Sequence, residues 1–208
     1  MNHLFEGKNF VFLGSSVTYG SASGGISFVE FIQELGKCGV IKEAVSGTTL
    51  VDNGESSYVK RFLNNLVVKH KNTQVDHLIV QLSTNDATQN KPLGRLSCSV
   101  LSNDMDTKTI VGAIEYIVAL AKETWNCKVS FYTGTRYKSE LYADMVEMLY
   151  EVQKKWGIGV IDLWHDEAMN AVSDAEYAEY MSDPIHPTLV GYRDWWVPKF
   201  MEHLQTYE

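Results

Sequence analysis

Short runs of apolar residues, rich in β-branched and aromatic types, alternate along this chain with longer stretches whose apolar residues recur at helical spacing. We expect strands at residues 9–13, 40–45, 75–82, 128–133 and 158–163. We expect helices at residues 26–35, 58–68, 110–125, 139–156 and 189–204. A strand–helix–strand order forces parallel pairing through right-handed crossovers. The sequence therefore predicts a three-layer α/β/α sandwich around a central parallel sheet of about five strands.

The length and composition indicate one globular unit. The chain has 208 residues, of which 45% are hydrophobic and 21% charged, and this excludes disordered and fibrous classes. Single domains run to about 250 residues, and no internal repeat, linker or low-complexity tract interrupts the pattern. We therefore expect a single domain over residues 1–208.

The charge balance and the cysteines point to a small-molecule partner in a reducing compartment. The 26 acidic residues outnumber the 18 basic ones, so nucleic acid and anionic membrane are unsuitable partners. No apolar run approaches the roughly 20 residues that span a bilayer, and the N-terminus lacks a secretory pattern. Cys38, Cys98 and Cys127 show no pairing in sequence. We expect a cytoplasmic protein, with a homo-oligomer left open.

The first turn with chemical potential follows the first expected strand. In open parallel sheets, functional groups gather at the carboxyl ends of the strands. Residues 14–20 read Gly-Ser-Ser-Val-Thr-Tyr-Gly, and a turn of this kind projects the Ser16 hydroxyl over the sheet. A plain turn and a backbone cradle for phosphate, as in flavodoxin-type cofactor loops, fit the same residues equally well.

Two further turns follow later strands. Gly47, within residues 45–49, lets the backbone approach a ligand closely and offers an N–H donor, although a structural turn explains it as well. Asn85 follows the strand expected at residues 75–82 and aims a neutral amide donor at the same crevice. Asn and Asp also favour such turns because they bond their own backbone.

The last turn, before the final helix, reads Ser-Asp-Pro-Ile-His-Pro over residues 182–187. Asp183 and His186 are three residues apart, so a carboxylate can accept from Nδ1–H and leave Nε2 free as a base. Pro187 suits the first position of a helix. A cap at Asp183 with His186 on the surface is the alternative. No comparable companion is expected for the other histidines: His3, His70, His77, His165 and His203.

Taken together and in this order, these turns resemble the four blocks of the SGNH hydrolases, also called the GDSL esterase/lipase superfamily. The blocks are Gly-Ser-Ser at 14–16, Gly47, Ser-Thr-Asn-Asp at 83–86 and Asp-Pro-Ile-His at 183–186. The sequence departs from the pattern at Ser15, where Asp is frequent, and at Ser83, where Gly is frequent. An asparagine often found just before the second block's glycine is also missing.

The resemblance implies the flavodoxin-like SGNH hydrolase fold and a serine hydrolase without metal or cofactor. It implies Ser16 as nucleophile, His186 as general base and acid, and Asp183 as the group that orients the imidazole. The oxyanion would be met by the N–H groups of Ser16 and Gly47 and by the Asn85 side chain.

The substrate is expected to be a short-acyl ester. The polar stretch after Asn85, which contains Arg95, Asn103 and Asp104, is expected to fold over one side of the site. We expect Ser15, Tyr19 and Arg95 to contact substrate. These polar loops favour acetyl esters of a carbohydrate or another small alcohol. We expect Trp195 and Trp196 to pack the last helix.

Three alternatives remain. The first is a thioesterase or lysophospholipase with the same triad. The second is a non-enzymatic flavodoxin-like module that binds a phosphate or cofactor at residues 14–20, and the third is an inactive scaffold.

Overall fold

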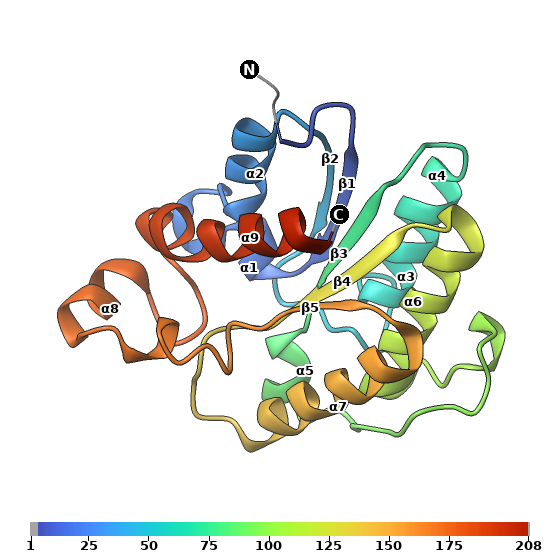
Figure 1. The fold of residues 1–208 in the computed structure, drawn as a ribbon. Helices are drawn as coiled ribbons and strands as arrows, with labels where there is room; N and C mark the ends of the chain where they lie inside the picture. The colour runs from blue at the N-terminus through green and yellow to red at the C-terminus, as the bar shows by residue number, and fades with distance from the viewer. Residues whose placement is uncertain (1–3, 208) are drawn as a thin grey trace.

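A five-stranded parallel sheet forms the centre of the molecule (Figure 1). The computed structural model describes residues 4–207, and within them the strand order is β2-β1-β3-β4-β5. The strands are β1 Asn9–Gly14, β2 Gly39–Ala44, β3 His77–Gln81, β4 Lys128–Tyr132 and β5 Gly159–Ile161. Val11 pairs with Ile41 of β2 and with Leu78 of β3. The predicted parallel sheet is confirmed, and its order is the flavodoxin-like one.

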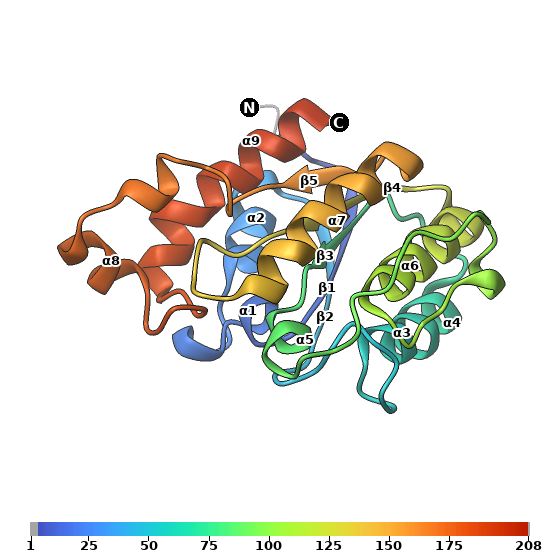
Figure 2. The ribbon, with the colours of Figure 1, turned by 90° about the horizontal axis from the view of Figure 1, so that it is seen from below.

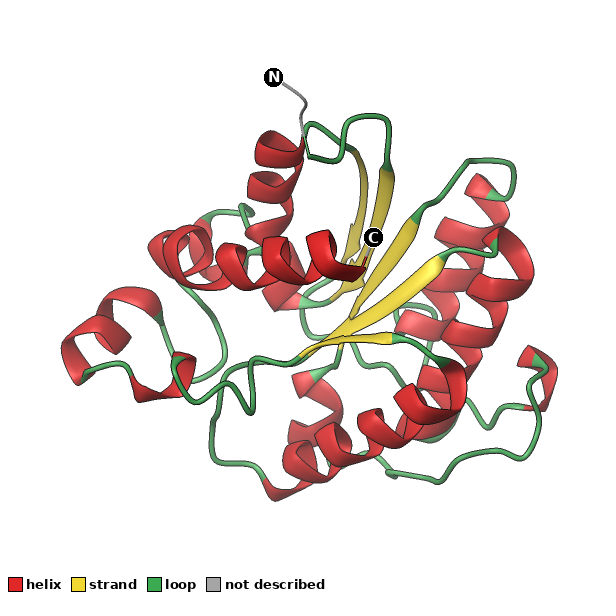
Figure 3. Ribbon diagram, in the orientation of Figure 1, coloured by secondary structure: helices red, strands yellow, loops and turns green. Residues whose placement is uncertain are grey.

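Helices cover both faces of this sheet and make the three predicted layers (Figures 2 and 3). One face carries α2 Phe28–Gly36, the six-residue π-helix η5 Gly191–Trp196 and α9 Val197–Tyr207. The other carries α3 Tyr58–Arg61, the π-helix η2 Phe62–Val67, α4 Val68–His70, α6 Ile110–Trp125 and α7 Glu140–Trp156. The short elements are α1 Ser16–Tyr19, η1 Ser21–Ser23, α5 Thr84–Thr88, η3 Ser102–Asp104, η4 Met169–Ala171 and α8 Asp174–Tyr180. Each face therefore has its own apolar cluster.

Local capping explains where the main helices begin and end. Ser27 and Glu30 form a capping box at the start of α2, in which the Glu30 carboxylate accepts from Ser27 N at 2.7 Å. Ser139 caps α7, which ends at Gly157 with a φ of +63°. These signals lie in the sequence itself, so the helix positions follow from local chemistry.

The last expected helix is present but divided. Residues 191–196 form the π-helix η5, and the regular α-helix α9 begins at Val197. Pro198 has no N–H to donate, and its ring would clash with the carbonyl four residues earlier in a regular helix. The π-helix η5, which ends two residues before Pro198, accommodates both constraints because its turns are wider than those of an α-helix.

The parallel arrangement brings the ends of β1 and β3 side by side, and these strands lead directly into α1 and α5. The edge formed by the carboxyl ends of the strands is therefore where the candidate residues are found. Cys38 and Cys127 are buried and Cys98 is exposed, and all three are free thiols. No helix within residues 4–207 is both long enough and apolar enough to cross a lipid bilayer.

Candidate active site

Ser16, His186 and Asp183 form a chain of contacts although they lie far apart in the sequence. Ser16 Oγ is 2.8 Å from His186 Nε2, and His186 Nδ1 is 2.8 Å from Asp183 Oδ2. A carboxylate only accepts hydrogen bonds, so the Asp183 contact places the ring proton on Nδ1. Nε2 is then free to accept from the Ser16 hydroxyl. The structure thus brings together the hydroxyl, the imidazole and the carboxylate.

The turn at residues 182–187 holds the Asp183 carboxylate in this position. Asp183 Oδ1 accepts from the backbone N–H groups of Ile185 at 2.8 Å and His186 at 2.9 Å. Partial burial raises the pKa of Asp183, but these N–H groups and the His186 ring outweigh it and lower the pKa below its ordinary value. The carboxylate therefore stays charged beside the imidazole.

Tight packing against β3 fixes the turn that carries Ser16. The Gln81 Oε1 atom accepts from Ser15 N at 2.9 Å and from Thr18 Oγ1 at 2.9 Å. A Cβ on Gly14 would lie 1.7 Å from Thr18 Oγ1, so only glycine allows this approach. Sequence reasoning missed Gln81, because the last residue of a buried strand gives no signal of this contact.

The Gly47 backbone takes a left-handed conformation with a φ of +80°. A Cβ at this position would meet open space, and the Gly47 N–H has no hydrogen-bond partner among the described residues. Behind it, the buried Asp86 carboxylate accepts from Leu50 N at 2.7 Å and Val51 N at 3.1 Å. Burial raises the pKa of Asp86 against the lowering effect of Ser83 and these two N–H groups. Asp86 thus anchors the loop that leaves the Gly47 N–H free.

A buried arginine, also missed from the sequence, ties this loop to β1. Arg61 is 4% exposed, and its Nη2 donates to Gly14 O at 2.8 Å and Thr48 Oγ1 at 2.9 Å. Its Nη1 reaches Glu43 Oε1 at 3.1 Å, and its Nε donates to Ser56 O at 2.8 Å. The guanidinium therefore joins the residues flanking Ser16 to those flanking Gly47.

The Asn85 amide lies between the two loops. Its Nδ2 donates to Ser15 Oγ at 3.2 Å and to Thr48 O at 3.0 Å. An amide nitrogen has two hydrogens, so both are engaged with protein oxygens. The sequence predicts that the Asn85 side chain aims its donors at an anion; in the structure these donors contact the neighbours of Ser16 and Gly47. Donation to an anion therefore requires exchanging one of these bonds.

The three expected substrate contacts, Ser15, Tyr19 and Arg95, lie in different surroundings. Ser15 is fully buried and accepts from Asn85, so it faces the protein and not a substrate. Replacement of the usual Asp by Ser at this position keeps an acceptor for Asn85. Tyr19 is 46% exposed, and its ring packs beside Gly25 and Lys42, whose Nζ lies 5.8 Å from the ring centroid.

The polar stretch does not fold over the site as expected, and Arg95 is displaced with it. Beyond α5 the chain crosses α6 and α7, where Ser97 N donates to the buried Glu115 at 2.8 Å and Ser102 N to Glu123 at 2.9 Å. Arg95 lines a separate hollow of about 490 Å³ with Asp104 and Asp106, which none of the triad residues lines. The Glu115 and Glu123 carboxylates attract the backbone N–H groups of the stretch and hold it against α6.

A narrow crevice lies next to the catalytic turn, although none of the triad residues lines it. Val17, Pro184 and Ile185, which are sequence neighbours of Ser16, Asp183 and His186, line it together with Thr135 and Tyr137. Its volume is about 10 Å³, which is room for the centre of one water molecule.

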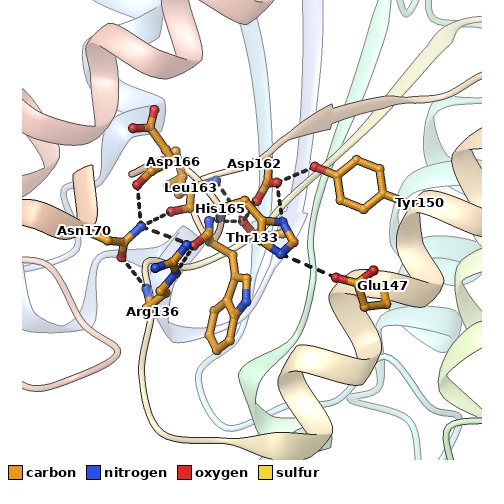
Figure 4. Close-up of polar contacts among 10 residues, drawn as sticks. Thr133, Arg136, Glu147, Tyr150, Asp162, Leu163, His165, Asp166 and Asn170 are labelled. Carbon is orange, nitrogen blue, oxygen red and sulfur yellow. Dashed lines mark hydrogen bonds and ion pairs between the residues drawn. The ribbon is translucent and has the colours of Figure 1, made fainter. Parts of the chain in front are cut away.

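A second Asp-x-x-His pair lies after β5 (Figure 4). His165 Nδ1 is 2.8 Å from Asp162 Oδ2, and His165 Nε2 is 3.4 Å from Glu147 Oε1. The Tyr150 hydroxyl also donates to Asp162. The expectation that His165 has no companion is therefore wrong, and the spacing from Asp162 was the signal. His165 faces Glu147 on α7, whereas His186 faces Ser16.

Within residues 4–207, no cluster of three or more His, Cys, Asp or Glu side chains is placed to hold a metal ion.

Comparison with known proteins gives a family and a fold. The model of the GDSL-like Lipase/Acylhydrolase family matches residues 12–193. None of the curated proteins matches the chain significantly in sequence. A structure from Lactobacillus plantarum is similar, with a TM-score of 0.77 and 18% identity, covering 98% of this chain and 99% of that chain.

Two esterase structures share the fold at low identity. One is a carbohydrate acetylesterase family member from Sinorhizobium meliloti, with a TM-score of 0.64, 14% identity, and 97% and 100% of the two chains covered. The other is the psychrotrophic esterase EstA from Pseudoalteromonas sp., in a structure inhibited by monoethylphosphonate, with a TM-score of 0.66, 13% identity, and 96% and 98% covered. At these identities the likeness concerns the fold.

Proposed function

The chain belongs to the GDSL-like lipase/acylhydrolase family and is a hydrolase that acts on ester bonds, and from this premise we propose that it is a serine esterase acting through an acyl-enzyme on Ser16. The single observation that carries the proposal is the 2.8 Å contact between Ser16 Oγ and His186 Nε2. A serine hydroxyl is too weak a nucleophile unless a base removes its proton, and this contact supplies the base.

The proposed reaction has two halves. As Ser16 Oγ attacks the ester carbonyl, its proton passes to His186 Nε2, and the tetrahedral intermediate then expels the alcohol, which takes that proton. In the second half, water gives a proton to His186 and attacks the acyl-enzyme, and the acid leaves as Ser16 regains its proton. Asp183 stabilises the imidazolium in both halves without becoming protonated.

The developing oxyanion needs preorganised donors. The N–H groups of Ser16 and Gly47 are suited to this role, because Ser16 opens α1 and the Gly47 N–H has no partner among the described residues. Asn85 serves as a third donor when the anion replaces Ser15 Oγ or Thr48 O as its acceptor. Such an exchange favours the transition state over the ground state, in which the amide is already satisfied.

The narrow crevice next to the catalytic turn takes up no acyl chain as it stands, because it has room for the centre of about one water molecule. A long acyl chain would therefore have to lie exposed on the surface of the protein, which is unfavourable and supports a short acyl group. We therefore propose acetyl and similarly short esters of a carbohydrate or another small alcohol as substrates. On this proposal the partner of the protein is a small-molecule ester, and the reaction involves neither nucleic acid nor a membrane.

The flavodoxin-like binding module is less consistent with the site. A phosphate cradle requires free backbone N–H groups in the turn, yet the N–H groups of Ser15 and Thr18 both bond to Gln81. The contact between Ser16 and His186 would also have no purpose in such a module.

A series of p-nitrophenyl esters of increasing chain length, with and without Ser16→Ala, tests the proposal. We expect Ser16-dependent hydrolysis that is fastest with acetate and falls as the acyl chain grows. A preference for chains of about eight carbons or more would contradict the short-acyl assignment and favour the lysophospholipase alternative. A parallel series of acyl thioesters tests the thioesterase alternative.

A further inference from the structure

Another hollow, of about 160 Å³, lies where the loop after β4 meets α8 and η5. The residues that line it include Arg136, Asp174, Tyr177 and Trp195. We call it the Arg136 hollow. Nothing in the proposed triad or oxyanion hole uses these side chains.

The Arg136 hollow lies next to the catalytic turn. Thr135 lines both this hollow and the crevice next to the catalytic turn, which Pro184 and Ile185 also line. Burial raises the pKa of Tyr177, and the nearby Asp183 carboxylate raises it further, which places Tyr177 within electrostatic reach of the triad. A substrate whose ester group lies at Ser16 can therefore extend its alcohol towards the hollow.

Arg136 is held in place before any ligand arrives (Figure 4). Its Nε donates to Trp164 O at 2.8 Å, and its backbone N donates to Asn170 Oδ1 at 2.8 Å. The Asn170 amide in turn bonds the carbonyl oxygens of Leu163 and Asp166, at 2.8 and 2.7 Å. No ion pair or hydrogen bond involves the Arg136 Nη atoms within residues 4–207. A fixed guanidinium with free donors is prepared to bind oxygen atoms.

Trp195 adds a donor that the protein does not satisfy. The side chain is 9% exposed and stacks on Tyr180 with ring centroids 5.3 Å apart. Its Nε1 has no hydrogen-bond partner among the described residues. Buried indole N–H groups usually find a partner, and Trp195 is part of the wall of the Arg136 hollow, so we assign its unsatisfied N–H to an acceptor on a ligand there.

We propose that the Arg136 hollow binds the alcohol part of the ester substrate, and that this alcohol is a single polyhydroxylated ring such as a monosaccharide unit. The proposal rests on the proposed esterase function and specifies its substrate. Arg136 and Trp195 supply donors and Asp174 an acceptor, which suits hydroxyl groups because each both donates and accepts. The Asp174 carboxylate disfavours an anionic ligand. A hollow smaller than the roughly 300 Å³ of drug-sized sites suits one ring.

Kinetics on two kinds of acetate ester test the proposal. Arg136→Gln and Trp195→Phe are assayed with monoacetylated methyl glucoside, galactoside and xyloside, and with p-nitrophenyl acetate, whose flat ring lacks hydroxyls. We expect each variant to lower kcat/KM by about tenfold on the preferred glycoside, mainly through KM, with p-nitrophenyl acetate within about twofold of wild type. Lys138→Gln removes an exposed charge from the same loop without altering the hollow, and serves as the control. Equal losses on both kinds of ester, or no loss, would overturn the proposal.

Binding without turnover separates this proposal from the esterase mechanism. In the Ser16→Ala protein, the Trp195 indole N–H resonance is identified by its absence from the Ser16→Ala, Trp195→Phe double variant. We expect the deacetylated methyl glycoside to shift that resonance saturably, and no shift with any of the three glycosides would refute the hollow as their site. If the resonance shifts while Ser16→Ala retains full hydrolysis, the esterase mechanism fails and the binding site stands.

Discussion

Arg61 Nη2 lies 2.8 Å from the carbonyl oxygen of Gly14, and the same guanidinium bonds Thr48 and Glu43. Gly14 is two residues before Ser16, and Thr48 follows Gly47. One buried side chain therefore sets the spacing between the nucleophile turn and the loop with the free Gly47 N–H. Its importance is testable, because lysine keeps the charge but lacks the planar fork of donors that spans acceptors as far apart as Gly14 O, Glu43 Oε1 and Ser56 O.

Arg61→Lys should lower both stability and activity. The substitution leaves the oxygens of Gly14, Thr48 and Ser56 short of donors in a buried site, so we expect a loss of about 3 kcal/mol in the free energy of unfolding. Urea denaturation measures it, and kcat should fall because the Gly47 loop loosens. The partly exposed Lys60→Gln serves as control, with an expected change of about 0.5 kcal/mol. A fully stable Arg61→Lys protein would show that the guanidinium is dispensable.

Asn85→Ala should leave the fold intact and lower kcat by about 10²–10³. The alanine protein loses one donor to the oxyanion, whereas the contacts to Ser15 Oγ and Thr48 O are replaceable by water at this half-buried position. Steady-state kinetics on p-nitrophenyl acetate, with circular dichroism as a fold control, provide the measurement. An unchanged kcat would mean that Asn85 keeps its resting bonds throughout the reaction.

Asp183→Asn tests orientation of the imidazole. Asparagine can present an N–H to His186 Nδ1 and so favour the tautomer whose Nε2 carries a proton, which blocks acceptance from Ser16. We expect kcat to fall by about 10³–10⁴. The matched control is His165→Gln, which disrupts the other Asp-x-x-His pair, where His165 faces Glu147. Equal losses in the two variants would argue against a specific role for Asp183.

Acid should destabilise the protein through His77. Burial lowers the pKa of this histidine from 6.5 to about 3, with smaller contributions from His203 and Lys128. Below pH 6.5, His77 therefore binds a proton in the unfolded chain but stays neutral in the folded protein down to about pH 3. The free energy of unfolding therefore falls as pH falls. We expect a slope of up to about 1.4 kcal/mol per pH unit between pH 6 and pH 4.

Urea denaturation across this pH range measures the slope. His77→Gln should reduce the slope by up to about 1.4 kcal/mol per pH unit, the contribution of one proton. Glutamine retains a hydrogen-bonding partner for Ser130, which contacts His77 Nε2 at 2.8 Å. An identical pH dependence in wild type and variant would contradict this origin of the acid sensitivity.

Most of the fold followed from the sequence, because buried strands such as His77–Gln81 are short apolar runs and helices such as Glu140–Trp156 have periodic apolar faces. Helix α8 was not expected, because its polar sequence lacks an apolar stripe. The capping box of Ser173 and Glu176 was the available signal for it. The resemblance to the GDSL family, drawn from four short motifs, is confirmed by the family match.

The supporting residues of the site could not be predicted. Arg61 and Gln81 act across 47 and 66 residues of chain, and no local pattern marks an arginine on a helix as the partner of Gly14 O. The path of Arg95 depended on attraction to carboxylates on α6, which only the folded chain reveals. Ser16 was found because its motif follows the end of β1, at the edge of the sheet that the topology determines, and His186 because of its Asp-x-x-His spacing before the final helix.

Labelling with a fluorophosphonate, followed by peptide mass spectrometry, tests the central claim most directly. The reagent reacts with a serine whose proton a neighbouring base removes, and the structure places one such hydroxyl, Ser16 Oγ, 2.8 Å from His186 Nε2. We predict a single adduct on Ser16, with none on the adjacent buried Ser15 and no labelling of Ser16→Ala. An adduct on another residue, or undiminished labelling of Ser16→Ala, would contradict the assignment of the nucleophile.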